Sequence, residues 1–384
     1  MGVTQYADGS WYPIRSGQTC PICGSKKGRC SAFINKEGQI VMYSCKYKES
    51  NRPSTNGGWY IHLANELSGD ASQKFNINIG DYTYEPITDE LLMLWDKVYR
   101  KFKSIFIRLN GGTALYESHK QDLINRGLDE TTINNLGCFS VPKNTKINYG
   151  SFNCSLRTAI VNELLKSFKP ETLIRVPGFK KAVANGKAYV TFKNTLYNNK
   201  TNNFEEIDGY FIPYFDYTSR FAAMQYRLMT PIFDENGKPM RYLWYSTKGV
   251  SCGSPINYHI PEKLELELED VILITEGALK GKIASEIIGV RSLSEAGVSN
   301  YRKLVRELQL LEELENRTTK YKILLALDMD KYTNKDVLTA EINTVALLKV
   351  LGYSVTILEW DINEGKGIDD KLKKSKKGFR FLTV

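Results

Sequence analysis

Apolar and polar positions alternate at two different spacings along the last third of the chain. From Asp270 onward, short apolar runs of the kind found in buried strands are separated by stretches with the apolar spacing of amphipathic helices. Strands are predicted at 271–275, 290–293, 322–327 and 354–359, and helices at 278–288, 301–314 and 335–351. Apolar strands that alternate with amphipathic helices predict a parallel sheet covered by helices on both faces.

The middle of the chain combines helices with strand-rich segments. Apolar spacing predicts a helix at 91–107, ended by Gly111 and Gly112, and two short helices within 118–136. Asp129 is placed to cap the second of these short helices. From about residue 174 to 258, aromatic and β-branched segments broken by Gly, Pro, Asn and Asp predict strands, among them KAYVTF, DGYFIPYFD, RFAAMQYRLM and RYLWYS.

Four of the seven cysteines lie within one short N-terminal segment. Cys20 and Cys23 form a C-x2-C pair followed by Gly24, and Cys30 and Cys45 complete the group across a predicted hairpin. Four thiolates in this pattern predict a closed, structural Zn²⁺ site. Two alternatives remain at this point: His62 in place of Cys30 as the fourth ligand, or reduced and buried cysteines without a metal.

Basic and aromatic side chains surround the cysteine segment. The basic residues are Lys26, Lys27, Arg29, Lys46 and Lys48, and the aromatic residues among them are Phe33 and Tyr43. Rings that stack on bases and cations that contact phosphates are typical of surfaces that bind single-stranded nucleic acid.

Acidic residues follow three of the predicted C-terminal strands. Glu276 comes directly after VILIT, Asp328 and Asp330 after KILLAL, and Asp361 after TILEW. The carboxyl ends of parallel strands share one rim of a sheet, so these carboxylates are expected to converge. Oxygen ligands without nearby His or Cys favour Mg²⁺ or Mn²⁺. The alternative for each residue is a helix cap or a solvated turn.

Composition and charge narrow the class of protein. With 42% hydrophobic and 25% charged residues, the 384-residue chain has the composition of a folded protein, not a disordered one. No apolar run approaches the roughly 20 residues that span a bilayer, and no signal-peptide pattern begins the chain, which predicts a soluble, cytoplasmic protein with no membrane contact. The net charge of +9 favours polyanionic partners. The acid-free tail 371–384 fits either a solvated helix end or a phosphate-contacting tail.

The motifs together resemble a known family. ITEG followed by ALDMD is similar to the TOPRIM domain of bacterial-type primases, topoisomerases, OLD-type nucleases and RecR-like proteins. The order of cysteine segment, strand-rich basic region and TOPRIM motifs resembles bacterial and phage-type DNA primases, particularly those of phages and mobile elements, and SHKQDLINRGLDETTINNLG resembles their RGL stretch. The resemblance implies an α/β protein: a zinc ribbon (1–67), a linker (68–90), a mixed α+β basic subdomain (91–265) and a TOPRIM domain with a basic tail (266–384).

The resemblance also implies site residues. Glu276, Asp328 and Asp330 match the family's catalytic carboxylates, and in EGKGIDDKL Asp369 matches its late acidic motif. Lys280 stands where these primases usually have a further aspartate, so a second metal ligand is missing there. Two roles are open for Lys280: its ammonium group contacts a triphosphate, or the aliphatic part of its side chain packs against the helix. Residues that would face nucleotide and template are Arg227, Arg241, Tyr242 and Lys248, with ordinary surface charge as the alternative.

The resemblance implies a DNA primase that joins nucleoside triphosphates on a single-stranded DNA template with structural Zn²⁺ and catalytic Mg²⁺ or Mn²⁺. No Walker-type phosphate loop occurs in the sequence, so a separate helicase is the expected partner. Two other functions use the same features. One is a metal-dependent nuclease or topoisomerase-like enzyme, and the other is a non-catalytic zinc-ribbon protein that binds DNA.

Overall fold

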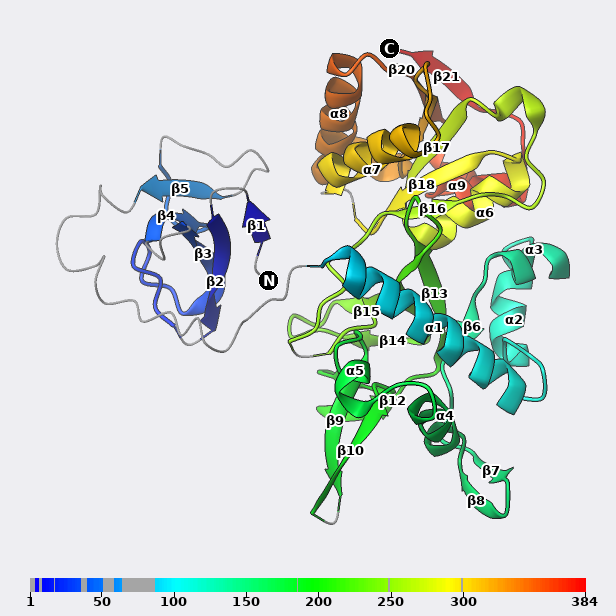
Figure 1. The fold of residues 1–384 in the computed structure, drawn as a ribbon. Coiled ribbons are helices and arrows are strands. Elements are labelled where there is room, and N and C mark those ends of the chain that lie inside the picture. Colours follow the sequence, from blue (N-terminus) through cyan, green and yellow to red (C-terminus); the bar gives the residue numbers. More distant parts are fainter. Residues whose placement is uncertain are drawn as a thin grey trace. The chain divides into compact units, whose positions relative to one another are not determined.

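The protein forms two compact units, Met1–Pro86 and Ile87–Val384, in the computed structural model (Figure 1). The structure describes residues 4–6, 9–16, 18–35, 40–50, 59–63, 87–184, 186–247, 249–297 and 300–384. Most of the predicted linker, and Lys248, lie outside these residues. The last two residues of that linker belong to the first helix, α1 (Asp89–Leu109), whose N-cap Thr88 accepts a hydrogen bond from the backbone N–H of Leu91.

The first unit is a five-stranded antiparallel sheet in sequence order. Its strands are β1 (Thr4–Tyr6), β2 (Gly9–Ser16), β3 (Lys27–Asn35), β4 (Ile40–Cys45) and β5 (Tyr60–Leu63). The predicted hairpin is the β3–β4 pair, in which Ala32 lies opposite Tyr43. Ile14, Ala32 and Tyr43 are buried together with three of the cysteines, so the core of this small unit is built around the thiol group.

The second unit begins with α1, which packs on a four-stranded antiparallel sheet. The sheet order is β15 (Pro239–Trp244), β14 (Phe221–Phe233), β13 (Gly209–Phe215) and β6 (Phe139–Ser140). One face of α1 is apolar because its buried residues recur at helical spacing, and Phe102 meets the rings of Phe139, Phe192 and Phe211 edge to face. The predicted helix and the predicted strands of this region are confirmed.

Two short helices and a set of small hairpins flank this sheet. The helices α2 (Glu117–Ile124) and α3 (Glu130–Asn135) confirm the predicted pair, and the Asp129 side chain caps α3 by accepting from the N–H of Thr132 at 2.8 Å. The remaining elements are β7 (Lys146–Tyr149), β8 (Phe152–Ser155), α4 (Leu156–Leu165), α5 (Pro170–Leu173), β9 (Phe179–Ala184), β10 (Lys187–Phe192), β11 (Thr195–Asn198) and β12 (Asn203–Glu206).

A six-stranded sheet forms the C-terminal part of the unit. Its order is β16 (Asn257–His259), β18 (Arg291–Glu295), β17 (Val271–Glu276), β19 (Lys322–Ala326), β20 (Ser354–Glu359) and β21 (Arg380–Thr383). The four central strands are parallel, and the two edge strands are antiparallel to their neighbours. The helices of this part are α6 (Ala278–Ile288), α7 (Tyr301–Leu314), α8 (Lys335–Val350) and α9 (Ile368–Lys374).

Alternate residues of the central strand β17 point into two different cores. Ile272 and Ile274 are buried with residues of α7 and α8, whereas Leu273 is buried with residues of α6 and α9. Helices therefore cover both faces of the sheet, as predicted. The mixed α/β architecture with an N-terminal cysteine-bearing unit is confirmed.

The basic tail is a solvated helix end only in part, because Lys373 and Lys374 at the end of α9 are exposed whereas Lys371 is not. Lys371 of α9 is fully buried, forms an ion pair with Glu364 at 3.2 Å and donates to backbone carbonyls. Beyond α9 the chain adds strand β21 to the sheet, where Arg380 pairs with Glu359 at 3.0 Å. Neighbouring carboxylates and carbonyls thus pair with part of the positive charge of the tail, for which the sequence pattern indicated no partner. None of the helices in the described ranges is long and apolar enough to cross a membrane.

Candidate active site and metal centre

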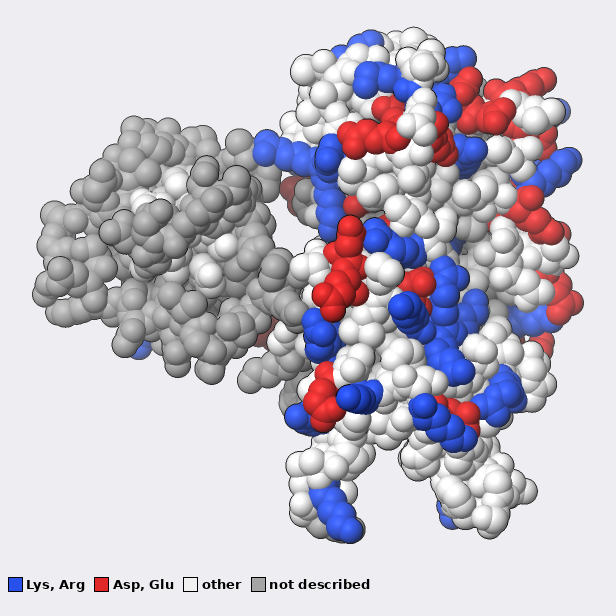
Figure 2. Space-filling view, in the orientation of Figure 1, with Lys and Arg blue, Asp and Glu red and all other residues white. Residues whose placement is uncertain are grey.

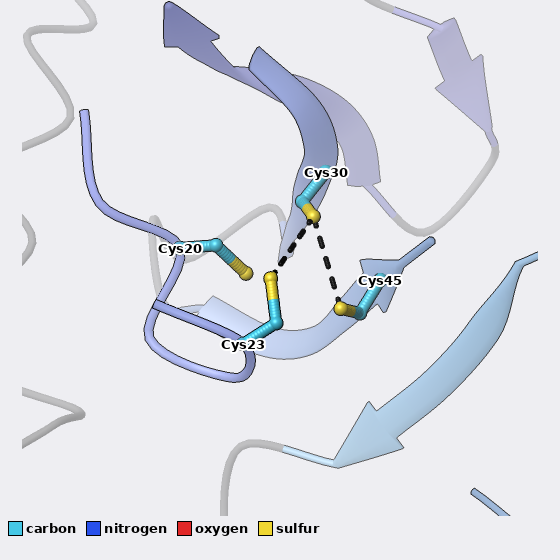
Figure 3. A group of neighbouring side chains, drawn as sticks. All are labelled: Cys20, Cys23, Cys30 and Cys45. Atoms are coloured by element: carbon cyan, nitrogen blue, oxygen red, sulfur yellow. Dashed lines mark hydrogen bonds between the residues drawn. The ribbon is translucent and has the colours of Figure 1, made fainter. Parts of the chain in front are cut away.

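The four predicted cysteine ligands converge in the first unit. Cys20 and Cys23 lie on the turn before β3, Cys30 lies in β3, and Cys45 ends β4 (Figure 3). Their sulfur atoms all lie within 4.8 Å of one another, and Cys30 Sγ is 3.8 Å from both Cys23 Sγ and Cys45 Sγ. Four sulfurs at about 2.3 Å from one tetrahedral ion would be about 3.8 Å apart. The cluster therefore fits a zinc site, with Cys30 as a member.

Local backbone geometry explains this convergence. The N–H of Gly24 donates to the carbonyl of Cys20 at 2.8 Å, and Gly24 has φ +70°, a conformation that favours glycine. The turn thus brings two thiols to one side. Burial raises the pKa of the Cys20 thiol to about 11, a cost that binding a doubly charged cation would offset. His62, the alternative ligand, lies on β5 and bonds to the carbonyl of Lys48 at 3.0 Å instead.

The surface beside the cysteine cluster is basic, as predicted, but the predicted aromatic residues Phe33 and Tyr43 are buried, and the rings at this surface are those of Tyr47 and Trp59. Lys27 lies over the ring of Tyr47, and Lys46 lies over the ring of Trp59, each 5.9 Å from the ring centroid. Both lysines are exposed, so their ammonium groups remain accessible to an anionic partner.

The predicted carboxylates of the second unit lie at the rim formed by the carboxyl ends of the parallel strands. Glu276 ends β17, and Gly277 after it has φ +81° and begins α6. Asp328 follows β19 and precedes the short 3-10 helix η6 (Met329–Tyr332), which contains Asp330. Asp361, in contrast, is exposed and caps the 3-10 helix η7 (Ile362–Glu364) through the N–H of Asn363. For Asp361 the alternative of a helix cap is therefore the correct one.

Two lysine ammonium groups lie among these carboxylates. Lys280 Nζ donates to both oxygens of Asp328, at 2.6 and 2.8 Å. Lys366 Nζ lies 2.7 Å from Asp330 Oδ2 and 3.5 Å from Asp328 Oδ2. Lys280 is therefore more than a packing stem on α6, because its ammonium group neutralises a side chain that is only 4% exposed.

Within the described residues, only the four cysteines form a group of three or more ligand residues whose ligand atoms lie within 4.8 Å of one another. The rim carboxylates are spaced more widely than that. Two of their buried oxygens, Asp330 Oδ1 and Asp369 Oδ1, have no hydrogen-bond partner. Hard oxygen atoms that are buried and unpaired are of the kind that Mg²⁺ or Mn²⁺ prefers, but these carboxylates would have to move closer together to share one ion.

Burial and mutual charge control ionisation at the rim. Burial raises the pKa of Glu276, and Asp328 and Asp330 add to this effect while Lys280 and Lys366 oppose it. The pKa of Lys280 is raised because its carboxylate neighbours outweigh its burial. Burial likewise raises the pKa of Asp369. The interacting charges place Glu276 in the same electrostatic environment as Asp328 and Asp330.

An ion-pair network connects the rim to α2 and β14. Arg126 lies 3.1 Å from Asp369 Oδ2 and 3.5 Å from Asp122 Oδ2, and Arg227 lies 3.2 Å from Asp122 Oδ1. Arg227 is buried, and its charge is already paired with Asp122. Arg241 is exposed and donates to the carbonyl of Met229, and Tyr242 is 44% exposed. Of the predicted nucleotide contacts in the described residues, these two and Lys280 remain accessible.

Three residues of the rim are absent from the sequence-based prediction. Glu295 ends β18 beside Glu276 in the parallel register and is 2% exposed. Burial raises its pKa to about 8. The rule that found Glu276 would also have found Glu295, but the predicted strand stopped at residue 293. Arg126 and Lys366 lie in the RGL and EGKGIDDKL motifs, but no strand-end rule points to them, because tertiary packing brings them to the carboxylates.

Comparisons with known proteins give one family match and several similar solved structures. Residues 266–378 match a family described as "Domain of unknown function (DUF3854)". No curated protein matches the chain significantly. The Aquifex aeolicus primase, zinc-binding and RNA polymerase domains, is similar with a TM-score of 0.48 and 12% identity over 100% of this chain and 81% of that chain.

Two further solved structures each match 74% of this chain. The E. coli primase catalytic core has a TM-score of 0.46 and 17% identity, and the match covers 74% of this chain and 76% of that one. A DnaG primase catalytic domain bound to ssDNA has a TM-score of 0.46 and 15% identity, over 74% and 75% of the two chains. At these values the likeness adds nothing about individual site residues.

Proposed function

We propose that this protein is a DNA primase that synthesises short oligonucleotide primers on single-stranded DNA by metal-dependent nucleotidyl transfer. One observation carries the proposal: the buried Asp328 and Asp369 and the partly exposed Asp330 lie at the carboxyl rim of a parallel sheet, beside three cationic side chains. One oxygen each of Asp330 and Asp369 is buried without a hydrogen-bond partner. Polyanionic substrates and a divalent cation both require such a mixture of charges. The proposal is also supported by the order of motifs along the chain.

The reaction requires a 3′ hydroxyl to attack the α-phosphate of a nucleoside triphosphate as pyrophosphate leaves. Asp328, Asp330 and Asp369, with Glu276, would hold Mg²⁺ or Mn²⁺, which neutralises triphosphate charge when bound. Lys280 and Lys366 would contact the phosphates. Lys366 is 56% exposed and lies between Gly365 and Gly367, so its ammonium group can turn from Asp330 toward an incoming triphosphate.

The rest of the network would hold these groups in position. Arg126 fixes Asp369 relative to α2, and Asp122 fixes Arg126 and Arg227. Glu276 suits two roles, because its raised pKa makes it a better proton acceptor than an ordinary carboxylate and its position also permits ion binding. Outside the rim, the zinc-type unit would hold the template on its Lys and Tyr surface.

A second candidate function is a non-catalytic DNA-binding protein. It is favoured by the pairing of Lys280 with both oxygens of Asp328, since a carboxylate neutralised by an ammonium group needs no metal. The sequence carries the same point, because Lys280 stands where the primases that this chain resembles usually have an aspartate.

One assay separates the candidates. The full chain is incubated with single-stranded DNA, labelled ribo- or deoxyribonucleoside triphosphates, and Mg²⁺ or Mn²⁺. New template-dependent oligomers support primase activity, degraded template indicates a nuclease, and binding without either product indicates the non-catalytic protein. Asp328→Asn should abolish synthesis, while Asp361→Asn, at an exposed cap, should not. Synthesis that survives Asp328→Asn would remove the rim from the mechanism.

A further inference from the structure

Nearly all of the excess positive charge of the chain belongs to one segment. Residues 143–193 contain ten Lys and Arg residues and two Glu residues, whereas the net charge of the whole chain is +9. This segment forms the hairpin β7–β8, the helices α4 and α5, and the hairpin β9–β10. A solvated surface usually carries both signs in alternation, so a single-sign segment indicates an anionic partner.

The two hairpins project from the end of the second unit that is remote from the six-stranded sheet (Figure 1). Figure 2 shows them as two separate projections with an open gap between them and basic side chains on the β9–β10 projection. A cavity of about 690 Å³ lies between α4 and the β9–β10 hairpin, lined by Arg157 and Asn162 of α4, by Asn144, and by Lys181 and Tyr189 of the hairpin. None of its lining residues belongs to the rim site, so it is a separate feature.

The lining combines cations, amides and an aromatic ring. Tyr189 is 49% exposed, so one face of its ring is open to a ligand. Arg157 lies over the ring of Phe192 at 4.8 Å and donates to the carbonyl of Phe192 at 2.6 Å, which fixes its guanidinium group. Its Nε is buried and has no hydrogen-bond partner. One acid, Glu171, also lines the cavity, and it is outnumbered by Arg157 and Lys181.

We propose that the cleft between helix α4 and the β9–β10 hairpin binds single-stranded DNA, apart from the site at the sheet rim. Cations within a cleft attract the phosphate backbone, and an exposed ring stacks on unpaired bases, which a duplex keeps inside its own stack. Amides such as Asn144 and Asn162 supply donors and acceptors to base edges. The features of the cleft predict binding to a single strand. The preference for DNA over RNA rests on the proposed function, in which the template is a DNA strand that is longer than the part held at the rim.

The experiment measures binding of the full chain to a fluorescent 20-nucleotide single strand by anisotropy at several salt concentrations. Tyr189→Ala should weaken binding about tenfold, since loss of one stacked base costs about this much. Lys181→Ala should lower the slope of log K against log salt by about 0.7, the value for one phosphate contact on a single strand. The matched controls are Tyr197→Ala, an exposed tyrosine on β11 outside the cavity, and Lys335→Ala at the exposed start of α8.

The outcomes distinguish this proposal from the proposed function. Tyr189→Ala should weaken single-strand binding by the same factor in the Asp328→Asn background as in the wild type, whether or not the protein makes primers. Equal losses for Tyr189→Ala and Tyr197→Ala would overturn the proposal. The proposal would also be overturned if a duplex or an RNA strand bound as tightly as single-stranded DNA and lost as much affinity on Tyr189→Ala. Displacement of the strand by a mononucleotide, at the dissociation constant of the mononucleotide itself, would overturn it as well.

Discussion

Lys280 Nζ donates to both carboxylate oxygens of Asp328, at 2.6 and 2.8 Å, across the gap between α6 and the end of β19. Both charges act on Glu276, at the end of the neighbouring strand β17: Lys280 lowers the pKa of Glu276 and Asp328 raises it. A positive side chain thus stands within a group of acids that would otherwise repel one another. The ammonium group lowers the charge that any divalent ion at the rim must neutralise.

Replacing the Lys280 ammonium group should make the thermal stability of the protein depend on Mn²⁺. In Lys280→Met, Asp328 is left buried with only the exposed Lys366, 3.5 Å away, as a cationic neighbour, which should cost about 3 kcal/mol in the free energy of unfolding. Mn²⁺ should restore more of the melting temperature to the variant than to the wild type, because the freed carboxylate can then bind the ion. Melting curves with and without MnCl₂ measure this.

Lys366→Met is the matched control for that prediction. Its side chain is 56% exposed, so its ion pairs with Asp330 and Asp328 should contribute less than about 1 kcal/mol. A loss as large as that of Lys280→Met would show that the rim responds to net charge alone and not to the buried pair.

The zinc prediction concerns the first unit. The purified protein should contain one Zn²⁺ per chain, and Cys30→Ser should lose it and unfold that unit, because Cys20, Cys30 and Cys45 are part of its small core. Metal analysis and proteolysis measure the two effects. Cys154→Ser, on β8 outside the cluster, should keep the metal. Full zinc content in Cys30→Ser would exclude this thiol as a ligand.

A partly buried carboxyl group on α7, that of Glu307, should make stability depend on pH. Burial raises the pKa of Glu307 from 4.5 to about 7, and its Oε2 has no hydrogen-bond partner. The folded protein therefore keeps a proton that the unfolded chain releases above about pH 4.5. Stability should fall as pH rises from about 4.5 to 7, by at most about 1.4 kcal/mol per pH unit from this group.

Glu307→Gln should remove this part of the pH dependence. Glu313→Gln, on the same helix with a side chain 64% exposed, is the control and should leave the slope unchanged. Denaturant unfolding at pH 5, 6 and 7 gives the slopes for the three proteins. Identical slopes for Glu307→Gln and the wild type would mean that Glu307 is ionised in the folded state.

Much of the second unit is predictable from local pattern. The bounds of α6, α7 and β20 agree with the apolar spacing, because each element buries one continuous apolar face. Asp129 caps α3 as its position before the helix indicates. The edge strands β16 and β21 were not predicted, since an edge strand needs no apolar run and forms wherever the chain returns to the sheet.

The site was harder to predict than the fold. Glu276 and Asp328 follow from their place at strand ends, but the partners that decide their charge come from elsewhere in the chain. Lys366 lies in the loop before α9, and Arg126 lies just after α2. Spacing along the sequence carries no information about such pairs, which form only when α2, α9 and the sheet pack together.

The central claim is that the rim carboxylates hold a divalent cation. Titration of Mn²⁺ into the zinc-loaded protein, followed by electron paramagnetic resonance of the free ion, tests this directly. The wild type should bind Mn²⁺ at a site that Asp328→Asn combined with Asp330→Asn abolishes, while Asp361→Asn leaves it intact. Equal Mn²⁺ binding by the wild type and the double variant would contradict the claim.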